Sequence, residues 1–228
     1  MMQRRLFTHA ALSAIGSMLL AERAHARRES QAVSGIRAAL ERGAVAAVNL
    51  LGRPDGFLGN PSVRIALPEP LHDVVKLLKV IGQQRRADEL MTAMNRAAEA
   101  AVPEAKPLLL NAVKAMSVED ARGILSGGDN AATQFFARKT RERLSRRFLP
   151  IVTRATEHVA LADKYNALVG EAASAGFVRS EDENLQQYVT GKALDGLYFM
   201  IGEEERKIRQ DPMATGSAIL KKVFGSLK

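Results

Sequence analysis

The sequence lacks cysteine and tryptophan altogether, and aromatic residues make up only 5% of its 228 residues. Without cysteine the chain cannot form a disulfide, a thiolate-bound metal site, an iron–sulfur cluster or a cysteine nucleophile. We therefore also expect no lipid anchor attached to an N-terminal cysteine. Hydrophobic residues make up 46% and charged residues 25%, so the chain is able to bury an ordinary globular core.

Histidine and the common catalytic motifs are also scarce. His72 and His158 are the two histidines beyond residue 26, and the sequence contains neither G-x-S-x-G nor H-E-x-x-H. We therefore expect no Ser-His-Asp triad, no histidine-rich metal site and no cofactor. A site that combines the two histidines with carboxylates stays open as an alternative.

The first 26 residues have the pattern of a cleavable export signal. Arg4 and Arg5 precede a weakly apolar run from Leu6 to Leu20, and Ala24-His25-Ala26 supplies an A-x-A cleavage site. The run has about 15 residues, fewer than the roughly 18–20 that a membrane-spanning helix needs. We predict cleavage after Ala26, with a frayed amphipathic first helix as the alternative.

The same segment predicts the export route and the destination. The sequence QRRLFTH resembles the twin-arginine export signal, although it lacks the usual Ser or Thr before the arginine pair. Cleavage would remove three arginines and one glutamate, which lowers the net charge from +8 to +6. A mildly basic periplasmic protein is suited to anionic lipid or acidic partners, and we expect no nucleic-acid partner.

Apolar residues recur at helical spacing along almost the whole chain, and no segment alternates for long enough to predict a strand. The spacing of Ser117 and Asp120 predicts a capping box, while Pro150 is expected to break or restart a helix. The sequence thus predicts one all-α domain from residue 27 onward, a multi-helix bundle with one long Pro/Gly-rich loop. The predicted helices cover about 30–51, 71–81, 85–101, 104–116, a helix from 117, 129–149, 151–161, 163–173, 181–210 and 213–224.

The long loop runs from Gly52 to Pro70, GRPDGFLGNPSVRIALPEP, and contains four prolines and three glycines. Irregular segments of this length in a compact domain are often functional. Arg53, Asp55 and Arg64 supply charge with which the loop could bind a ligand. The structural alternative is a proline-stiffened loop that covers one end of the bundle, with Arg53 and Asp55 paired to each other.

The segment GILSGGDNAATQFF places two glycines before a new helix, which is a position where phosphates bind. No G-K-[ST] follows, however, and Asp129 occupies the expected N-cap position. Its carboxylate would bind the very amides that an anion needs. We predict a tight corner in which Gly127 and Gly128 end the preceding helix, with a ligand role for Asp129 as the alternative.

A polar cluster on the predicted helix 85–101 is a further candidate site. Asn95, Arg96 and Glu99 lie within about one turn and are flanked by small alanines in MNRAAEAAVPEAKP. These side chains could bind a ligand on one helix face. The alternative is a solvated ion pair.

The long helix before Asp211 carries a second candidate. Gly191, Asp195, Tyr198 and Gly202 share one stripe, and its glycines predict the close approach of another helix or of a ligand. We therefore predict a crowded, partly dry environment for Asp195, which would need a partner. A structural hydrogen bond or ion pair is the alternative to a functional carboxylate.

Two charged runs are predicted to face solvent. The segment ARKTRERLSRRF has an inner stripe at every fourth residue and a basic outer face, which is either solvated or suited to an anionic membrane surface or an acidic partner. The acidic run Glu203–Glu205 is predicted to lie mostly at the surface. The basic face consists of Arg138, Lys139, Arg141, Arg143, Arg146 and Arg147.

Four segments carry a resemblance to a known family: RPDGFLGNPSVRIALP, MNRAAEAAVPEAKP, ILSGGDNAAT and YVTGKALDGLYFMIGEEERKIRQDP. They resemble an uncharacterised bacterial family, the domain of unknown function 4197. The likeness covers about residues 34–224. It implies an exported helical protein, and it brings no activity, ligand or catalytic residue.

Three functions are compatible with these patterns. The first is a periplasmic protein that binds a small acidic or amphiphilic molecule, or a partner protein, between the long loop and the helices that carry Arg96 and Asp195. The second is an enzyme with Asp195 or Glu99 as general base. The third is an envelope-associated structural protein that acts through its basic face. A pocket with convergent charged groups would favour the first two, and a solid core the third.

Overall fold

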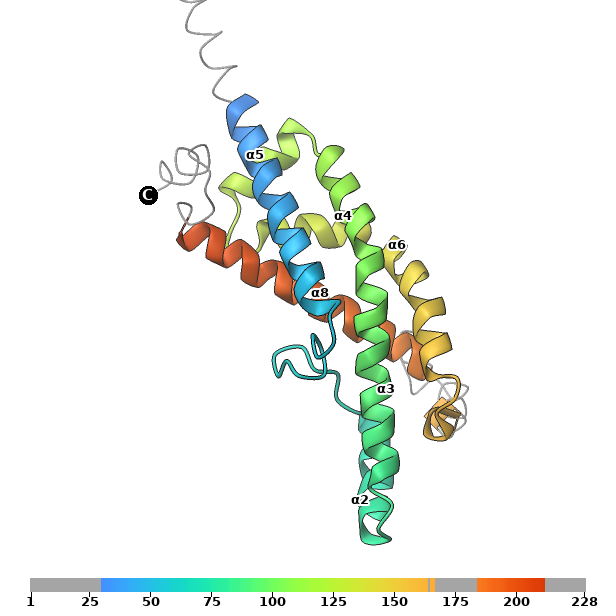
Figure 1. Cartoon of the computed structure of the whole chain (residues 1–228). Helices are drawn as coiled ribbons and strands as arrows, with labels where there is room; N and C mark the ends of the chain where they lie inside the picture. The colour runs from blue at the N-terminus through green and yellow to red at the C-terminus, as the bar shows by residue number, and fades with distance from the viewer. Residues whose placement is uncertain (1–29, 164, 167–183, 212–228) are drawn as a thin grey trace, which may run out of the picture.

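The computed structural model describes residues 30–163, 165–166 and 184–211, which form a helical bundle without strands (Figure 1). This confirms the predicted all-α, single-domain, multi-helix fold. The export signal and the predicted helix 213–224 lie outside the described residues, as does most of the predicted helix 163–173. The described elements are a first helix over residues 30–51, η1 (Glu69–Leu71), α2 (His72–Val80), α3 (Arg85–Ala101), η2 (Val102–Glu104), α4 (Ala105–Lys114), α5 (Val118–Ser126), α6 (Ala131–Thr156), helical turns at 160–163 and 165–166, and α8 (Leu185–Gln210).

Helix α6 lies at the centre of the bundle. It packs most extensively against α8 and α3, and it also contacts α4 and α5. One face of α6 is buried because every fourth residue is apolar or is a threonine whose hydroxyl bonds within the fold. This confirms the predicted inner stripe. The buried residues at this spacing are Phe136, Thr140, Leu144, Phe148, Val152 and Thr156.

The prediction that Pro150 breaks or restarts this helix is wrong. Helix α6 continues through Pro150 to Thr156. Proline removes one backbone donor and normally kinks a helix interior. Here both Pro150 and Arg146, whose carbonyl loses its helical partner, lie on the exposed face. Water can therefore bond that carbonyl group, and the buried stripe on the opposite face keeps the helix in place.

Local signals at the ends of α5 agree with the prediction. Ser117 Oγ accepts a hydrogen bond from Asp120 N at 3.0 Å, and Ser117 N donates to Asp120 Oδ2 at 3.1 Å, which completes the capping box. The hydrogen bond from the Ser117 backbone keeps the pKa of Asp120 below its usual value. Helix α5 then ends at Gly127, where a Cβ atom would lie 2.7 Å from the Gly123 carbonyl oxygen.

The long loop folds back from the first helix onto the bundle. Phe57, at its centre, is fully buried. Its ring lies against Gly196 of α8, where a Cβ atom would come within 2.7 Å of Phe57 Cε1. Gly56 is equally constrained, since its Cβ would lie 2.4 Å from the Leu51 carbonyl oxygen. The loop is therefore packed into the core, with Phe57 and Val63 beside Gly196 of α8.

Replacing Gly196 with alanine should destabilise the protein by about 1–3 kcal/mol, because overpacking a filled core forces side chains or backbone to move. The added methyl would meet Phe57 Cε1 at 2.7 Å and Val63 Cβ at 3.3 Å. Gly191→Ala is the matched control on the same helix, since nothing lies within 4 Å of its Cβ position. It should be neutral or stabilise the helix by up to about 1 kcal/mol. Thermal unfolding measures both, and equal shifts would contradict the loop packing.

Candidate functional site

Asn95 fastens the second half of the long loop to α3. Its Oδ1 accepts a hydrogen bond from Ile65 N at 2.8 Å, and its Nδ2 donates to Ile65 O at 2.9 Å and to Met91 O at 2.8 Å. The side chain is fully buried. A side-chain amide that pairs with both backbone groups of one residue replaces the hydrogen bonds of a strand partner. Asn95 therefore fixes the position of the loop around Ile65.

Glu99, one turn further along α3, fastens the first half of the loop. Its Oε1 accepts hydrogen bonds from the backbone N–H groups of Phe57 and Leu58, both at 3.0 Å. Its Oε2 accepts from Arg96 Nη1 at 2.7 Å. The glutamate side chain is 6% exposed, so these three donors satisfy a buried charge. The hydrogen bond to Glu99 also raises the pKa of Arg96.

The predicted internal pairing of Arg53 with Asp55 is wrong. Asp55 instead pairs with Arg96, whose Nη2 lies 2.8 Å from Asp55 Oδ1. The reason is local geometry. Pro54 and Asp55 form the corner of a turn closed by a hydrogen bond from Gly56 N to Arg53 O, and Asp55 has a φ of 64°. This turn presents the Asp55 carboxylate to α3. The structure therefore contains the ion pair that was the alternative for the cluster on α3, between Arg96 and Glu99. The predicted solvation of this cluster is wrong for Asn95 and Glu99, because both are buried.

A groove of about 430 Å³ lies on the other side of the loop, between the loop and α8. Such a volume is within the range of small-molecule sites. Backbone and side chains of the loop form one wall, and α8 forms the other. The groove is lined by Ser62, Val63, Arg64, Ile65, Ala66, Tyr188, Lys192, Asp195, Gly196 and Phe199.

The charged and aromatic side chains of this groove are held in fixed positions. Tyr188 donates a hydrogen bond from its hydroxyl to Ala66 O at 3.1 Å, and Lys192 Nζ lies 5.6 Å from the centre of the Tyr188 ring. Phe199 is 45% exposed. Asp195 is neutralised by Arg141 of α6, at 2.6 Å between Oδ1 and Nη2. Arg64 lines the groove, but its Nη2 contacts Met91 Sδ of α3 at 3.3 Å, so Lys192 supplies the positive charge on the α8 side.

The structure corrects the predicted environment of Asp195. Its side chain is 54% exposed, because the helix turns the stripe of Gly191 and Asp195 toward solvent rather than into a crowded interface. Tyr198 is buried, and its hydroxyl is 2.9 Å from Thr140 Oγ1. The Arg141 guanidinium that pairs with Asp195 also lies over the Tyr198 ring, 5.8 Å from its centre. Burial raises the pKa of Tyr198. Asp195 therefore belongs to the groove, and Tyr198 belongs to the packing between α6 and α8.

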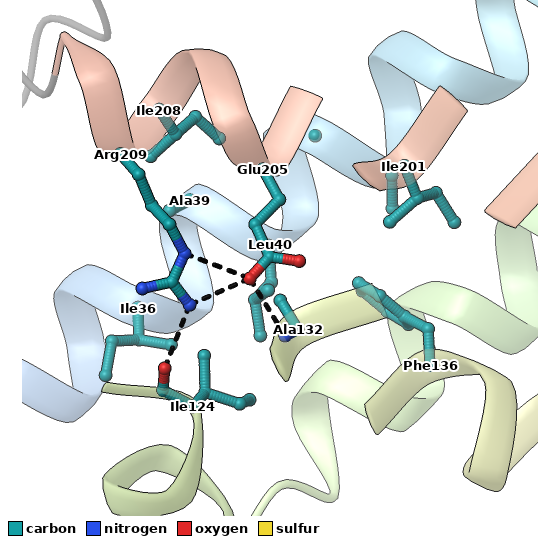
Figure 2. A pocket seen from close by; sticks show the side chains of 12 residues that line it. Ile36, Ala39, Leu40, Ile124, Ala132, Phe136, Ile201, Glu205, Ile208 and Arg209 are labelled. Atoms are coloured by element: carbon teal, nitrogen blue, oxygen red, sulfur yellow. Dashed lines mark hydrogen bonds and ion pairs between the residues drawn. The ribbon is translucent and has the colours of Figure 1, made fainter. Parts of the chain in front are cut away.

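Asp129 does not cap α6, contrary to the prediction. The N-cap residue is Asn130, which makes no side-chain cap bond, and Asp129 is exposed. The amides are instead bonded to Glu205 of α8, which accepts from Ala132 N at 3.0 Å (Figure 2). Glu205 also accepts from Thr133 N at 2.9 Å. A carboxylate does fill the position of an anion, as expected, but it comes from 73 residues away. The nearby depression over Gly127 is lined by two carboxylates, Glu119 and Asp120, and one cation, Arg138, a balance that disfavours a phosphate.

Glu205 also corrects the prediction for the acidic run. Glu203 and Glu204 are half-buried and pair with residues on their own helix, whereas Glu205 is buried. Arg209 donates to Glu205 Oε1 from Nε at 3.1 Å and from Nη2 at 2.8 Å, and Nη2 also bonds Ile124 O at 3.0 Å (Figure 2). Glu205 thus joins the ends of α5, α6 and α8.

A narrow apolar gap lies beside this cluster, between the first helix and α8 (Figure 2). Its volume of about 30 Å³ is roughly that of one water molecule. Its walls are almost entirely aliphatic, and the Glu205 oxygens at its edge are already bonded. The gap therefore offers neither space nor free polar groups to a ligand.

The predicted basic face of α6 is exposed, as expected, but much of its charge is neutralised by ion pairs. Within the described residues, no ion pair is formed by Arg138 or Arg143. Surface pairs of this kind contribute little to stability, yet they reduce the net positive field of the face. The paired residues are Lys139 with Asp120, Arg141 with Asp195, Arg146 with Glu142 and Arg147 with Glu104.

Two properties of the described residues bear on function. No three His, Asp or Glu side chains in these residues come together as metal ligands. None of the described helices has both the length and the apolar character that crossing a bilayer requires. The groove beside α8 combines a cavity of ligand size with the predicted candidate residues Arg64 and Asp195.

Comparison with known proteins identifies the family. The chain matches the family model described as "Protein of unknown function (DUF4197)" over residues 26–225. No curated protein and no solved structure gives a match. Because the match covers most of the chain, the protein belongs to the DUF4197 family.

Proposed function

We propose that this protein is a non-catalytic periplasmic binding protein whose groove between the long loop and α8 receives a small acidic or amphiphilic molecule. The observation that carries the proposal is the groove of about 430 Å³ with a positive charge at its rim and aromatic rings in its wall. Tyr188 and Phe199 offer apolar surface to the body of such a molecule. Lys192 offers charge to an anionic group.

The architecture around the groove supports binding by a preformed surface. Asn95 and Glu99 hold the loop through buried hydrogen bonds to the backbone of Ile65, Phe57 and Leu58. A wall fixed in this way loses little conformational entropy when a ligand arrives. The loop thus contributes to function through its position, while its charged tip at Asp55 is occupied by Arg96.

The two carboxylates considered as general bases are both engaged in other contacts, which favours binding over catalysis. Glu99 accepts from three donors and lies on the far side of the loop from the groove. Asp195 lines the groove, but its Oδ1 is paired with Arg141 at 2.6 Å. A base must be free to accept a proton from a substrate.

Two features of the sequence support export. Residues 1–26 have the order of a cleavable twin-arginine signal, from the arginine pair through the apolar run to Ala24-His25-Ala26. The match to the family model begins at residue 26, next to the proposed cleavage site. An anionic or amphiphilic molecule of the periplasm, or an envelope protein that carries such a group, is the ligand class that we propose.

An aromatic anion tests the groove directly. We expect 8-anilinonaphthalene-1-sulfonate to bind the purified protein, and Lys192→Gln to weaken its binding about tenfold, because one charge-assisted contact is lost. Phe199→Ala should weaken binding to a similar extent by removing apolar contact. A fluorescence titration gives the dissociation constants, and native mass spectrometry reports any molecule that copurifies.

Matched substitutions outside the groove serve as controls. Lys106→Gln on α4 removes an exposed lysine, and Val118→Ala removes an exposed apolar side chain on α5. Neither should change the dissociation constant by more than about twofold, since neither lines the groove. Equal weakening by Lys106→Gln and Lys192→Gln would show that the probe responds to net charge, and the groove would lose its assignment.

A further inference from the structure

The hairpin between α2 and α3 ends in two aliphatic side chains that the described residues leave exposed. Val80 is 83% exposed and Ile81 is 56% exposed. Among the described residues, the other large hydrophobic side chains with comparable exposure are Val118 and Phe199, which lie singly on other helices. Adjacent exposed aliphatic residues at one chain reversal are costly in water and indicate a surface that another phase or partner covers.

The backbone holds this hairpin tip, residues 79–86, in a defined conformation. Gly82 has a φ of 73°, Gly82 N donates to Lys79 O at 3.2 Å, and Gln83 N donates to Leu78 O at 2.7 Å. These two bonds are the pattern of a Schellman motif, which ends a helix with a left-handed residue. Nothing lies within 4 Å of the Cβ position of Gly82. The tip is therefore a tight, open turn that presents Val80 and Ile81 outward.

Three cations surround the two aliphatic side chains. Lys79, Arg85 and Arg86 are all exposed, and the segment between residues 79 and 86 contains no acidic residue. Arg85 pairs with Glu89, one turn behind the tip, at 3.2 Å and with 90% of its side chain exposed. The end of the hairpin thus combines an apolar centre with a basic rim.

The hairpin tip is also positioned to meet a surface first. Helix α2 packs chiefly against η1 and α3. Figure 1 shows α2 and the first turns of α3 extending past the other described helices at one end of the bundle. A planar surface could therefore contact residues 79–86 without covering the groove beside α8.

We propose that the hairpin tip docks the protein on an anionic phospholipid bilayer, with Val80 and Ile81 entering the interface and Lys79, Arg85 and Arg86 contacting lipid phosphates. Apolar residues flanked by Lys and Arg are the chemistry that interfacial anchors use. Two aliphatic side chains are too small an area for a stable protein interface, which needs about 800 Å² from each partner. A bilayer requires no complementary pocket. The basic face of α6, with four of its six cations already paired, is the weaker candidate.

Cosedimentation with vesicles tests this docking. The wild-type protein and its variants are purified identically, so that any effect of residues 1–29 is common to all of them. Each protein is mixed with phosphatidylcholine vesicles that either contain or lack phosphatidylglycerol. We expect binding to the vesicles that contain phosphatidylglycerol. Val80→Ser with Ile81→Ser should reduce the partition coefficient at least about tenfold. Lys79→Gln, Arg85→Gln and Arg86→Gln together should reduce it about a hundredfold at low ionic strength.

Controls with the same chemical changes separate the tip from other surfaces. Arg138→Gln, Arg143→Gln and Arg154→Gln remove three exposed cations of α6, and Val118→Ser removes an exposed aliphatic side chain. Both should retain vesicle binding within about threefold, and the tip variants should retain 8-anilinonaphthalene-1-sulfonate binding at the groove. Far-UV circular dichroism confirms that each variant folds.

Three results would overturn the proposal. The first is failure of the wild type to bind phosphatidylglycerol vesicles. The second is greater loss with the α6 triple variant than with the tip triple variant, which would assign the membrane contact to the basic face. The third is a wild-type dimer in analytical ultracentrifugation that becomes a monomer in the Val80→Ser, Ile81→Ser double variant, while vesicle binding is the same in both proteins. That result would assign the tip to contact with a second copy of the chain.

Discussion

Glu205→Gln should lower the free energy of unfolding by about 3–5 kcal/mol, the cost of removing one partner from a buried ion pair. The Glu205 side chain is 6% exposed, and that of Arg209 is 15% exposed. Two backbone amides of α6 and the Thr133 hydroxyl also depend on the carboxylate. A glutamine keeps the shape but has one acceptor oxygen for these donors, and it removes the negative charge that pairs with Arg209. Urea denaturation followed by circular dichroism measures the change.

The acidic run itself supplies the controls. Glu203→Gln and Glu204→Gln make the same chemical change two and one residues away, in side chains that are 28% and 20% exposed and pair with neighbours on α8. Pairs of this kind contribute roughly 0–1 kcal/mol. We expect shifts of at most about 1 kcal/mol from either variant. Losses of the same size from all three glutamates would contradict the special position of Glu205 at the start of α6.

Signals that act within a few residues were sufficient to predict most helix ends. Ser117 and Asp120 are three residues apart and bond each other, so the capping box is visible in the sequence and present in the fold. Gly127 ends α5 for a similarly local reason, because a side chain there would collide with the preceding turn. The period of the apolar residues fixed the fold class in the same way, since each helix buries its own stripe.

The buried role of Glu205 was also within reach of the sequence, although its charge concealed it. Leu194, Leu197 and Ile201 recur at spacings of three and four on α8, and Glu205 follows at the next step of four on the same buried stripe. Asp195 stands one residue off this stripe, which is why it is exposed. A carboxylate in phase with an apolar stripe is thus a better indicator of a buried functional or structural charge than neighbouring glycines.

The partners of the long loop could not be predicted, because they depend on tertiary distance. Proline and glycine content predicted an irregular segment, and the loop is one. Asp55 however pairs with Arg96, 41 residues later, and Glu99 reaches the amides of Phe57 and Leu58. No spacing within the loop encodes these contacts. Lys192 and Tyr188, which complete the groove, were missed for the same reason, since they become neighbours of Ala66 only in the folded chain.

The anchoring of this loop leads to the second large effect: Asn95→Ala should destabilise the protein by about 2–4 kcal/mol. The substitution leaves Ile65 N and Ile65 O without their partner in a buried position, and each unsatisfied buried group costs about 1–3 kcal/mol. Urea denaturation measures the loss. Asn111→Ala on α4, an exposed position, is the matched control and should change stability by less than about 0.5 kcal/mol.

The same variant connects stability to the proposed site. If Asn95 holds one wall of the groove, its loss should let the loop open locally. Trypsin should then cut after Arg64 faster than the loss of global stability alone accounts for. Binding of 8-anilinonaphthalene-1-sulfonate should weaken in parallel, although Asn95 does not line the groove. Faster cleavage with undiminished probe binding would show that the loop is not a wall of the binding site. Cleavage at Arg64 that accelerates only in proportion to the loss of global stability would show instead that the loop and the bundle unfold as one unit, and the groove would then be as rigid as the core beneath it.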